Sequence, residues 1–128
     1  MEFTFHRTVP GAMADVVDRV KEALKAEGFG VLTEIDIEAT LKAKLGAEFR
    51  PYRILGACNP PLAQKALEAE PRIGVMLPCN VIVQQIGNGE VEIAAINPAA
   101  PMGAIGNPAL TEIAVEVGLR LQRVVAAI

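Results

Sequence analysis

Two cysteines, Cys58 and Cys79, are the residues of this sequence best suited to chemistry. A thiolate can act as a nucleophile or bind a soft metal ion, and it is favoured where a cysteine precedes the N-terminus of a helix. Each cysteine is followed by an asparagine, Asn59 and Asn80, whose amide could orient a bound group. Cysteine is also among the most commonly buried residue types, so both side chains could equally be small apolar members of the core.

A metal site is one form that this chemistry could take. Thiolates from Cys58 and Cys79, together with the imidazole of His6, would hold a soft divalent ion such as zinc and leave its fourth position open. The spacing of the cysteines matches neither a two-residue redox loop nor a zinc knuckle. The sequence therefore proposes the three ligands without showing that they meet, and His6 also fits an exposed strand residue.

Three acidic side chains form a second candidate for a cation site. Glu34, Asp36 and Glu38 alternate, so in an extended chain their carboxylates would share one face and could bind a hard cation. The alternative interpretation is that Asp36 caps a helix while the other two carboxylates face solvent.

Apolar periodicity and turn residues predict the elements that position these side chains. The expected strands cover residues 1–6, 29–35, 51–58, 79–86 and 90–96. One long helix carries an apolar stripe from Met13 to Leu24 and ends at Gly28 in a left-handed conformation. A second long helix begins at Asn107 and continues to Ile128.

Two short helices are expected between the strands. Asp36 is the predicted N-cap of one that ends at Gly46, and Asn59 is the predicted N-cap of another that Pro71 closes. This arrangement would place Cys58 at the corner where a strand passes into a helix.

The last two strands should form a hairpin around Asn88–Gly89, which is a favoured two-residue turn. With these two residues as the loop, the predicted cross-strand pairs are Gly87 with Glu90, Val81 with Ile96, and Val83 with Ala94. Cys79 would then share a face with the two valines.

Composition limits the class of protein. The 128 residues, of which 52% are hydrophobic, suit one packed domain over residues 1–128. The net charge of -3 disfavours binding to nucleic acid or to an anionic membrane. The chain has no serine, which excludes a serine nucleophile. With no signal peptide and no apolar run of membrane-spanning length expected, we predict a cytoplasmic protein.

The order of elements predicts an α+β two-layer sandwich. The segments Gly28–Phe29, Glu34–Asp36, Tyr52–Pro60 and Leu77–Asn80 also resemble domain of unknown function family 302. That resemblance implies a curved sheet backed by two long helices, similar to the TATA-box-binding-protein fold, and often a homodimer. Together with the expected elements it predicts a mostly antiparallel sheet of about five strands with two long and two short helices. It implies no activity.

Three classes of function follow from these residues. The first is a module that binds a small ligand or a metal ion in a groove between the sheet and the C-terminal helix, with Cys58, Asn59, Cys79 and Asn80 at one end. The second is a thiol-dependent redox or sulfur-transfer enzyme in which Cys58 is the nucleophile and Cys79 resolves it. The third is a structural homodimer without chemistry, formed through a sheet edge or the long helix.

Overall fold

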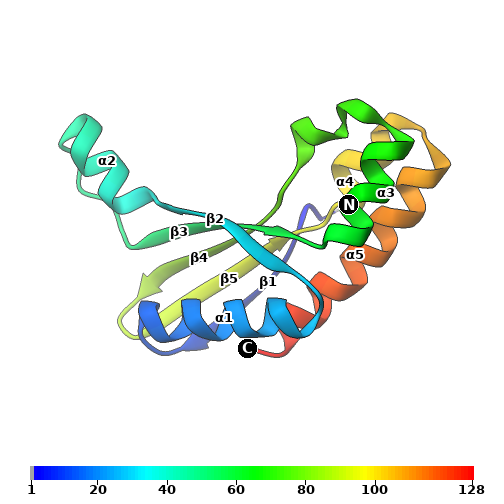
Figure 1. Ribbon diagram of the computed structural model, residues 1–128. Coiled ribbons are helices and arrows are strands. Elements are labelled where there is room, and N and C mark those ends of the chain that lie inside the picture. Colours follow the sequence, from blue (N-terminus) through cyan, green and yellow to red (C-terminus); the bar gives the residue numbers. More distant parts are fainter. Residues whose placement is uncertain (1) are drawn as a thin grey trace.

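Five antiparallel strands form one sheet in the computed structural model, which describes residues 2–128 (Figure 1). Their order across the sheet is β1-β5-β4-β3-β2. The strands are β1 (Thr4–Pro10), β2 (Gly30–Asp36), β3 (Tyr52–Cys58), β4 (Cys79–Gly87) and β5 (Glu90–Ile96). The helices are α1 (Met13–Ala26), α2 (Ile37–Leu45), α3 (Pro60–Ala69), α4 (Ala99–Met102) and α5 (Pro108–Ala126), with 3-10 turns η1 (Pro71–Met76) and η2 (Gly103–Ile105). The predicted α+β class is confirmed.

The first strand differs from its expected range of residues 1–6. Met1 lies outside the described residues, and β1 continues to Pro10, where it still pairs with Glu90 of β5. Val9 is buried in this extension, so the strand is prolonged by a core contact that the alternation of the first residues did not reveal.

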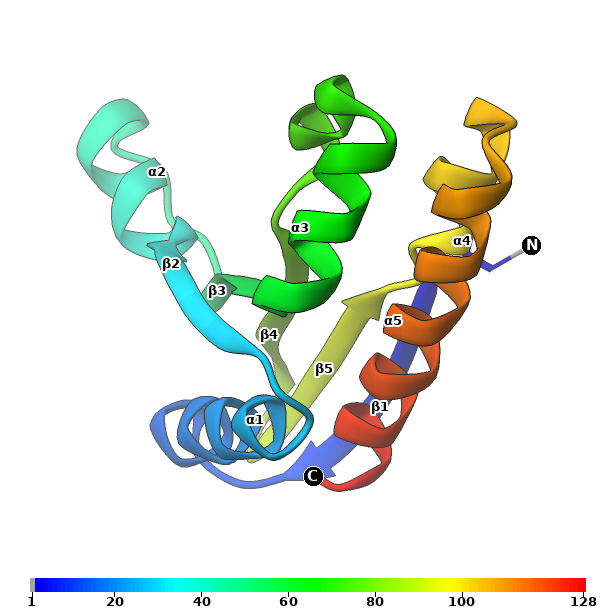
Figure 2. The same cartoon turned by 45° about the vertical axis from the view of Figure 1, so that its right-hand side comes forward.

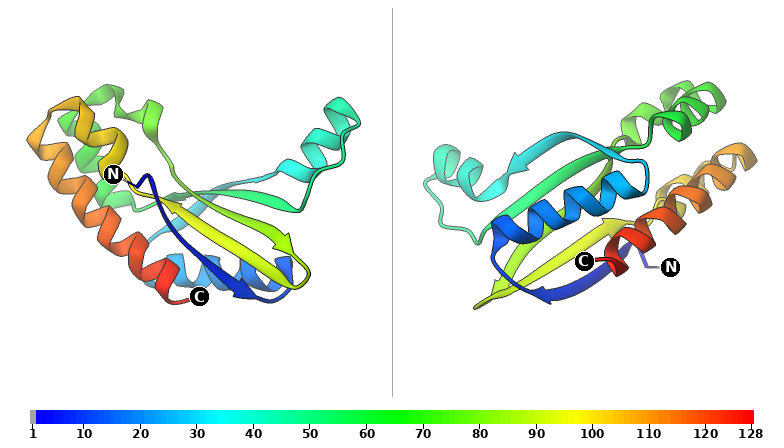
Figure 3. Two further views of the ribbon diagram at one scale, coloured as in Figure 1. Left: turned by 180° about the vertical axis from the view of Figure 1, so that it is seen from behind. Right: turned by 60° about the horizontal axis from the view of Figure 1, so that its bottom comes forward.

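The long helices α1 and α5 both lie on one face of the sheet, as Figures 2 and 3 show. The main core between these layers contains the fully buried side chains Val16, Val20, Leu24, Leu55, Val81, Val83, Ile93, Leu121 and Val124. Burying one such side chain stabilises a fold by about 1.5–3 kcal/mol before the loss of chain entropy is counted. No helix within residues 2–128 is both long and apolar enough to cross a membrane.

The end of α1 matches its prediction. Gly28 adopts a φ of 85°, and the Phe29 amide donates to the Leu24 carbonyl oxygen at 2.9 Å. A side chain on Gly28 would meet the amide nitrogen of Asn59 at 3.0 Å and the guanidinium of Arg120 at 3.2 Å. The C-terminus of α1 therefore meets the start of α3 and the side of α5 at a position that only glycine fits.

The hairpin between β4 and β5 has a different register from the one predicted. Gly87 pairs with Glu90 as expected, but a bulge between Gln85 and Gly87 shifts the rest of the ladder. The observed pairs are Val81 with Ala95 and Val83 with Ile93, so the predicted pairs with Ile96 and Ala94 are wrong. A regular register would turn Val91, Ile93 and Ala95 to the outer face, whereas the bulge turns all three into the core.

The predicted N-caps of both short helices, Asp36 and Asn59, are confirmed. The two helices differ in how they pack against the rest of the protein. The Ala39 amide donates to Asp36 Oδ1 at 2.9 Å, yet α2 buries none of its residues and projects from a corner of the sheet (Figure 1). In contrast, α3 packs against α5 (Figure 2) and helps to enclose a second, smaller core. This end cluster consists of Ala66, Ile73, Met102, Leu110 and Ala114.

Candidate functional site

A cavity of about 330 Å³ lies between the main core and the end cluster, and both cysteines line it. Its walls come from β2, from the ends of β3 and β4, from α3 and η1, and from α4 and α5. We call it the cysteine cavity; its lining residues are Phe29, Leu32, Ala57, Cys58, Asn59, Leu62, Ala63, Ala66, Leu67, Gly74, Leu77, Pro78, Cys79, Met102, Ile113 and Val117. The structure therefore brings Cys58, Asn59 and Cys79 to one place. It leaves Asn80 out, exposed on β4.

Local structure explains how the cysteines reach the cavity. Cys58 is the last residue of β3 and is half-buried. Asn59 then caps α3, with its Oδ1 accepting the Leu62 amide at 3.2 Å. Cys79 begins β4 directly opposite Ala57 of β3, so the two cysteines enter the same end of the sheet from neighbouring strands. Both thiols are free.

The two thiols differ in their surroundings. Burial raises the pKa of Cys79 from 9.0 to about 11, and the neighbouring Cys58 adds to this increase. Cys79 is consequently a neutral thiol at physiological pH. Since the thiolate is the form that attacks electrophiles and binds metals, Cys79 serves as an apolar wall residue.

Asn59 has a structural task besides lining the cavity. It is the one buried polar or charged side chain among the described residues, with 7% of its surface exposed. Its oxygen holds the first turn of α3, so it fixes where Cys58 ends its strand. We therefore regard Asn59 as a positioning residue for the cavity wall.

His6 does not join the cysteines. It lies on the edge strand β1, opposite Ala94, and Thr4 Oγ1 is 3.1 Å from its Nδ1. His6 shares the outer face of the sheet with Ala94, whereas Cys79 lies on the helix-covered face. Within residues 2–128 no three or more His, Cys, Asp or Glu side chains are grouped to hold a metal ion. The proposed zinc arrangement of Cys58, Cys79 and His6 is not formed.

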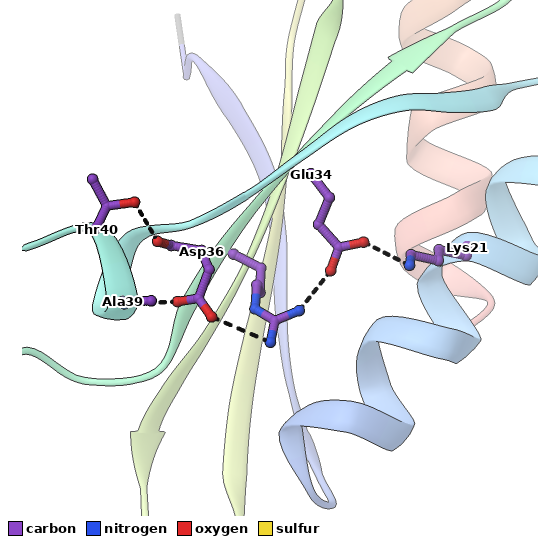
Figure 4. Close-up of polar contacts among 6 residues, drawn as sticks. Lys21, Glu34, Asp36, Ala39 and Thr40 are labelled. Carbon is purple, nitrogen blue, oxygen red and sulfur yellow. Dashed lines mark hydrogen bonds and ion pairs between the residues drawn. The ribbon is translucent and has the colours of Figure 1, made fainter. Parts of the chain in front are cut away.

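The carboxylates of β2 are neutralised by basic side chains (Figure 4). Glu34 pairs with Lys21 Nζ of α1 at 2.6 Å and also with Arg53 of β3, whose guanidinium reaches Asp36 at 3.4 Å. The hydrogen bond from Lys21, supported by Arg53, lowers the pKa of Glu34. These four residues line a second hollow of about 380 Å³, which we call the carboxylate hollow.

This arrangement decides between the two interpretations of the acidic residues. Asp36 is the helix cap, and Glu38 is exposed. A cation would have to displace Lys21 and Arg53, so the acidic residues are ion-pair partners and a cap.

Sequence reasoning missed much of the cavity wall. It placed the groove between the sheet and the C-terminal helix, which supplies Ile113 and Val117, but it gave no wall to α3. The helical spacing of Leu62 and Ala66 could have predicted this wall, because it gives the short helix an apolar face that must pack against another element.

A five-stranded antiparallel sheet with two long helices on one face and several shorter ones defines the fold class as α+β. The chain belongs to the family described as domain of unknown function DUF302, whose model matches residues 5–128. A crystal structure of an uncharacterized conserved protein DUF302 from Bacillus stearothermophilus is similar to it. The two are 34% identical over 99% of this chain and 98% of that chain, with a TM-score of 0.91. No curated protein matches the chain.

Proposed function

We propose that the protein is a small-molecule-binding module and that the cysteine cavity is its site. The observation that carries this proposal is the meeting of two separate hydrophobic clusters around a hollow that neither one fills. Ligand sites are typically concave, mostly apolar and about 300–1,000 Å³ in volume, with a few polar groups. The cysteine cavity agrees with this description in size and in lining.

The thiol chemistry of the two cysteines favours binding over catalysis. A redox or sulfur-transfer enzyme in which Cys58 is the nucleophile would need Cys79 as a thiolate to resolve the intermediate, and burial keeps the Cys79 thiol protonated. The only histidine of the chain, His6, lies on β1, and the strand β5 lies between it and the strands that carry the cysteines, so it cannot act as a base for either thiol. The metal form of the site lacks its third ligand for the same reason.

The test fills the cavity with a larger side chain and measures whether fragments still raise the melting temperature. Ala63→Leu adds a side chain to the half-buried wall position on α3, and Ala43→Leu makes the same change on exposed α2 as a matched control. A fragment collection that includes charged, polar and apolar molecules is screened by thermal shift against all three proteins. We expect fragments that raise the melting temperature of the wild type and of Ala43→Leu, but not of Ala63→Leu. A screen without hits, or hits that Ala63→Leu leaves unchanged, would contradict the proposal.

A second function, assembly into a homodimer, is supported by the outer face of the sheet. Ile35, Ile54 and Ile82 are cross-strand neighbours there, and the row continues to Ala94 of β5. Both long helices lie on the opposite face (Figure 3), and Ile35 is 45% exposed. A second copy packed on this row would remove it from water.

Sedimentation of two charge variants tests this dimer. We expect a wild-type dimer that Ile82→Glu dissociates, while Leu119→Glu on the exposed surface of α5 does not. Dissociation by Leu119→Glu alone would place the interface on the helix, and a monomeric wild type would refute the assembly.

A further inference from the structure

We infer that the cysteine cavity takes an uncharged, hydrocarbon-like group and rejects charged ones. This inference rests on the proposed function, because it names the chemistry of the ligand at the same site. It is carried by the charge, the size and the rim of the cavity.

The wall offers no counter-ion for an ionic group. No Lys, Arg, Asp, Glu or His lines the cavity, and the one amide in the wall, Asn59, already uses its oxygen to cap α3. A charged group that entered would lose its hydration without gaining a counter-ion, which is strongly unfavourable. An uncharged apolar group pays no such cost.

The sulfur atoms of the wall are equally suited to an apolar ligand. Cys58, Cys79 and Met102 bring three sulfurs to a lining that is otherwise aliphatic apart from Phe29 and Asn59. Cys79 is a neutral thiol because of its burial. Neutral sulfur is polarizable and packs well against hydrocarbon and against the edges of aromatic rings.

The volume limits the size of the bound group. An apolar cavity of about 150 Å³ holds one benzene molecule, so about 330 Å³ has room for roughly two fused rings or a chain of about ten carbons. A larger ligand would have to leave part of its structure outside.

The rim supports the same chemistry. Leu32 and Leu67 both line the cavity, yet they are 67% and 42% exposed. A hydrocarbon group seated between them would remove two large apolar side chains from water, which favours binding in addition to the contacts inside.

The experiment compares two ring ligands that differ in charge and adds a neutral chain. Naphthalene, 2-naphthalenesulfonate and 1-decanol are titrated into the wild type, Ala63→Leu and Ala43→Leu, and binding is followed by methyl NMR shifts of Leu62, Ile113 and Val117. We expect naphthalene, 1-decanol or both to shift these methyl signals, and we expect the sulfonate to bind at least about tenfold more weakly than naphthalene. Ala63→Leu should abolish the shifts, and Ala43→Leu should retain them. The better of the two neutral probes tells whether the natural group is a flat ring system or a chain.

The outcomes separate this inference from the proposed function. Binding of the sulfonate as tight as that of naphthalene, lost in Ala63→Leu, would overturn the apolar ligand class but support a small-molecule site. The same follows if only charged or polar fragments bind in the cavity. Absence of binding by every probe and every fragment would overturn both. Because the methyl shifts report on the wild type, the inference can be refuted even if Ala63→Leu fails to fold.

Discussion

The carboxylate hollow and the cysteine cavity are similar in volume, at about 380 and 330 Å³, but they are built in opposite ways. In the carboxylate hollow the groups that could bind a ligand bind each other, as Lys21 and Arg53 neutralise Glu34 and Asp36. In the cysteine cavity the walls are apolar and do not fill the space between them. A cluster of charges is therefore a weaker sign of a site in this protein than a hollow left by incomplete packing.

The largest expected effect comes from the thiol of Cys79. Its pKa in the folded protein is about 11, against 9.0 for an ordinary cysteine. Because the folded value is the higher one, the neutral thiol contributes its full stability below pH 9, and this stability is lost as the pH rises to about 11. We expect a loss of about 3 kcal/mol over this range, measured by urea unfolding.

Cys79→Ala is the control for that measurement. It should lose this part of the pH dependence. An unchanged pH dependence in Cys79→Ala would show that the thiol is hydrated through the cavity and that the two hollows differ less than their linings indicate.

The asparagines that follow the two cysteines provide the next test. Asn59→Ala removes a buried helix cap at the wall of the cysteine cavity, and we expect it to lower the free energy of unfolding by about 1–2 kcal/mol. Asn80→Ala changes an exposed residue and should cost less than about 0.5 kcal/mol. Equal losses in chemical denaturation would contradict the positioning role of Asn59.

The corresponding cap beside the carboxylate hollow should matter less to the whole fold. Asp36→Ala removes the cap of α2, a helix that buries none of its residues. We expect local fraying, seen as faster amide exchange in α2, with a change of under about 1 kcal/mol in global stability. Asp36→Asn keeps a capping oxygen and should restore slow exchange, unless the ion pair with Arg53 is what holds the helix.

The smallest expected effect is on the ion pairs themselves. Lys21→Met should raise the pKa of Glu34 towards its ordinary value, which a carboxyl NMR titration would measure. Since the folded pKa is lowered, these pairs stabilise the protein above pH 4.5 and lose their effect as the pH falls through the lowered value. We expect a stability change below about 1 kcal/mol at pH 7, because the pair is partly exposed. A larger loss would mean that the carboxylate hollow is a structural centre of the fold.

Local signals of the sequence predicted most of the fold. The left-handed turn at Gly28, the caps at Asp36 and Asn59 and the turn at Asn88–Gly89 agree with expectation. Each depends on hydrogen bonds or backbone angles within a few residues, so the relevant physics is contained in a short segment. The alternation of polar and apolar residues likewise predicted strands, and apolar residues at helical spacing predicted the two long helices.

Tertiary structure decided everything that depends on distant residues. The bulge at Gln85–Gly87 shifts the register so that Ile93 of β5 faces the helices. The residues of the turn alone do not predict this shift. One partner of Glu34 is Lys21, thirteen positions earlier, and His6 is separated from both cysteines by the strand β5. The cysteine cavity exists because two clusters of side chains pack without closing on each other. Helices and strands can be predicted from the sequence because they depend on short-range hydrogen bonds. A binding site depends on how those elements pack together in space.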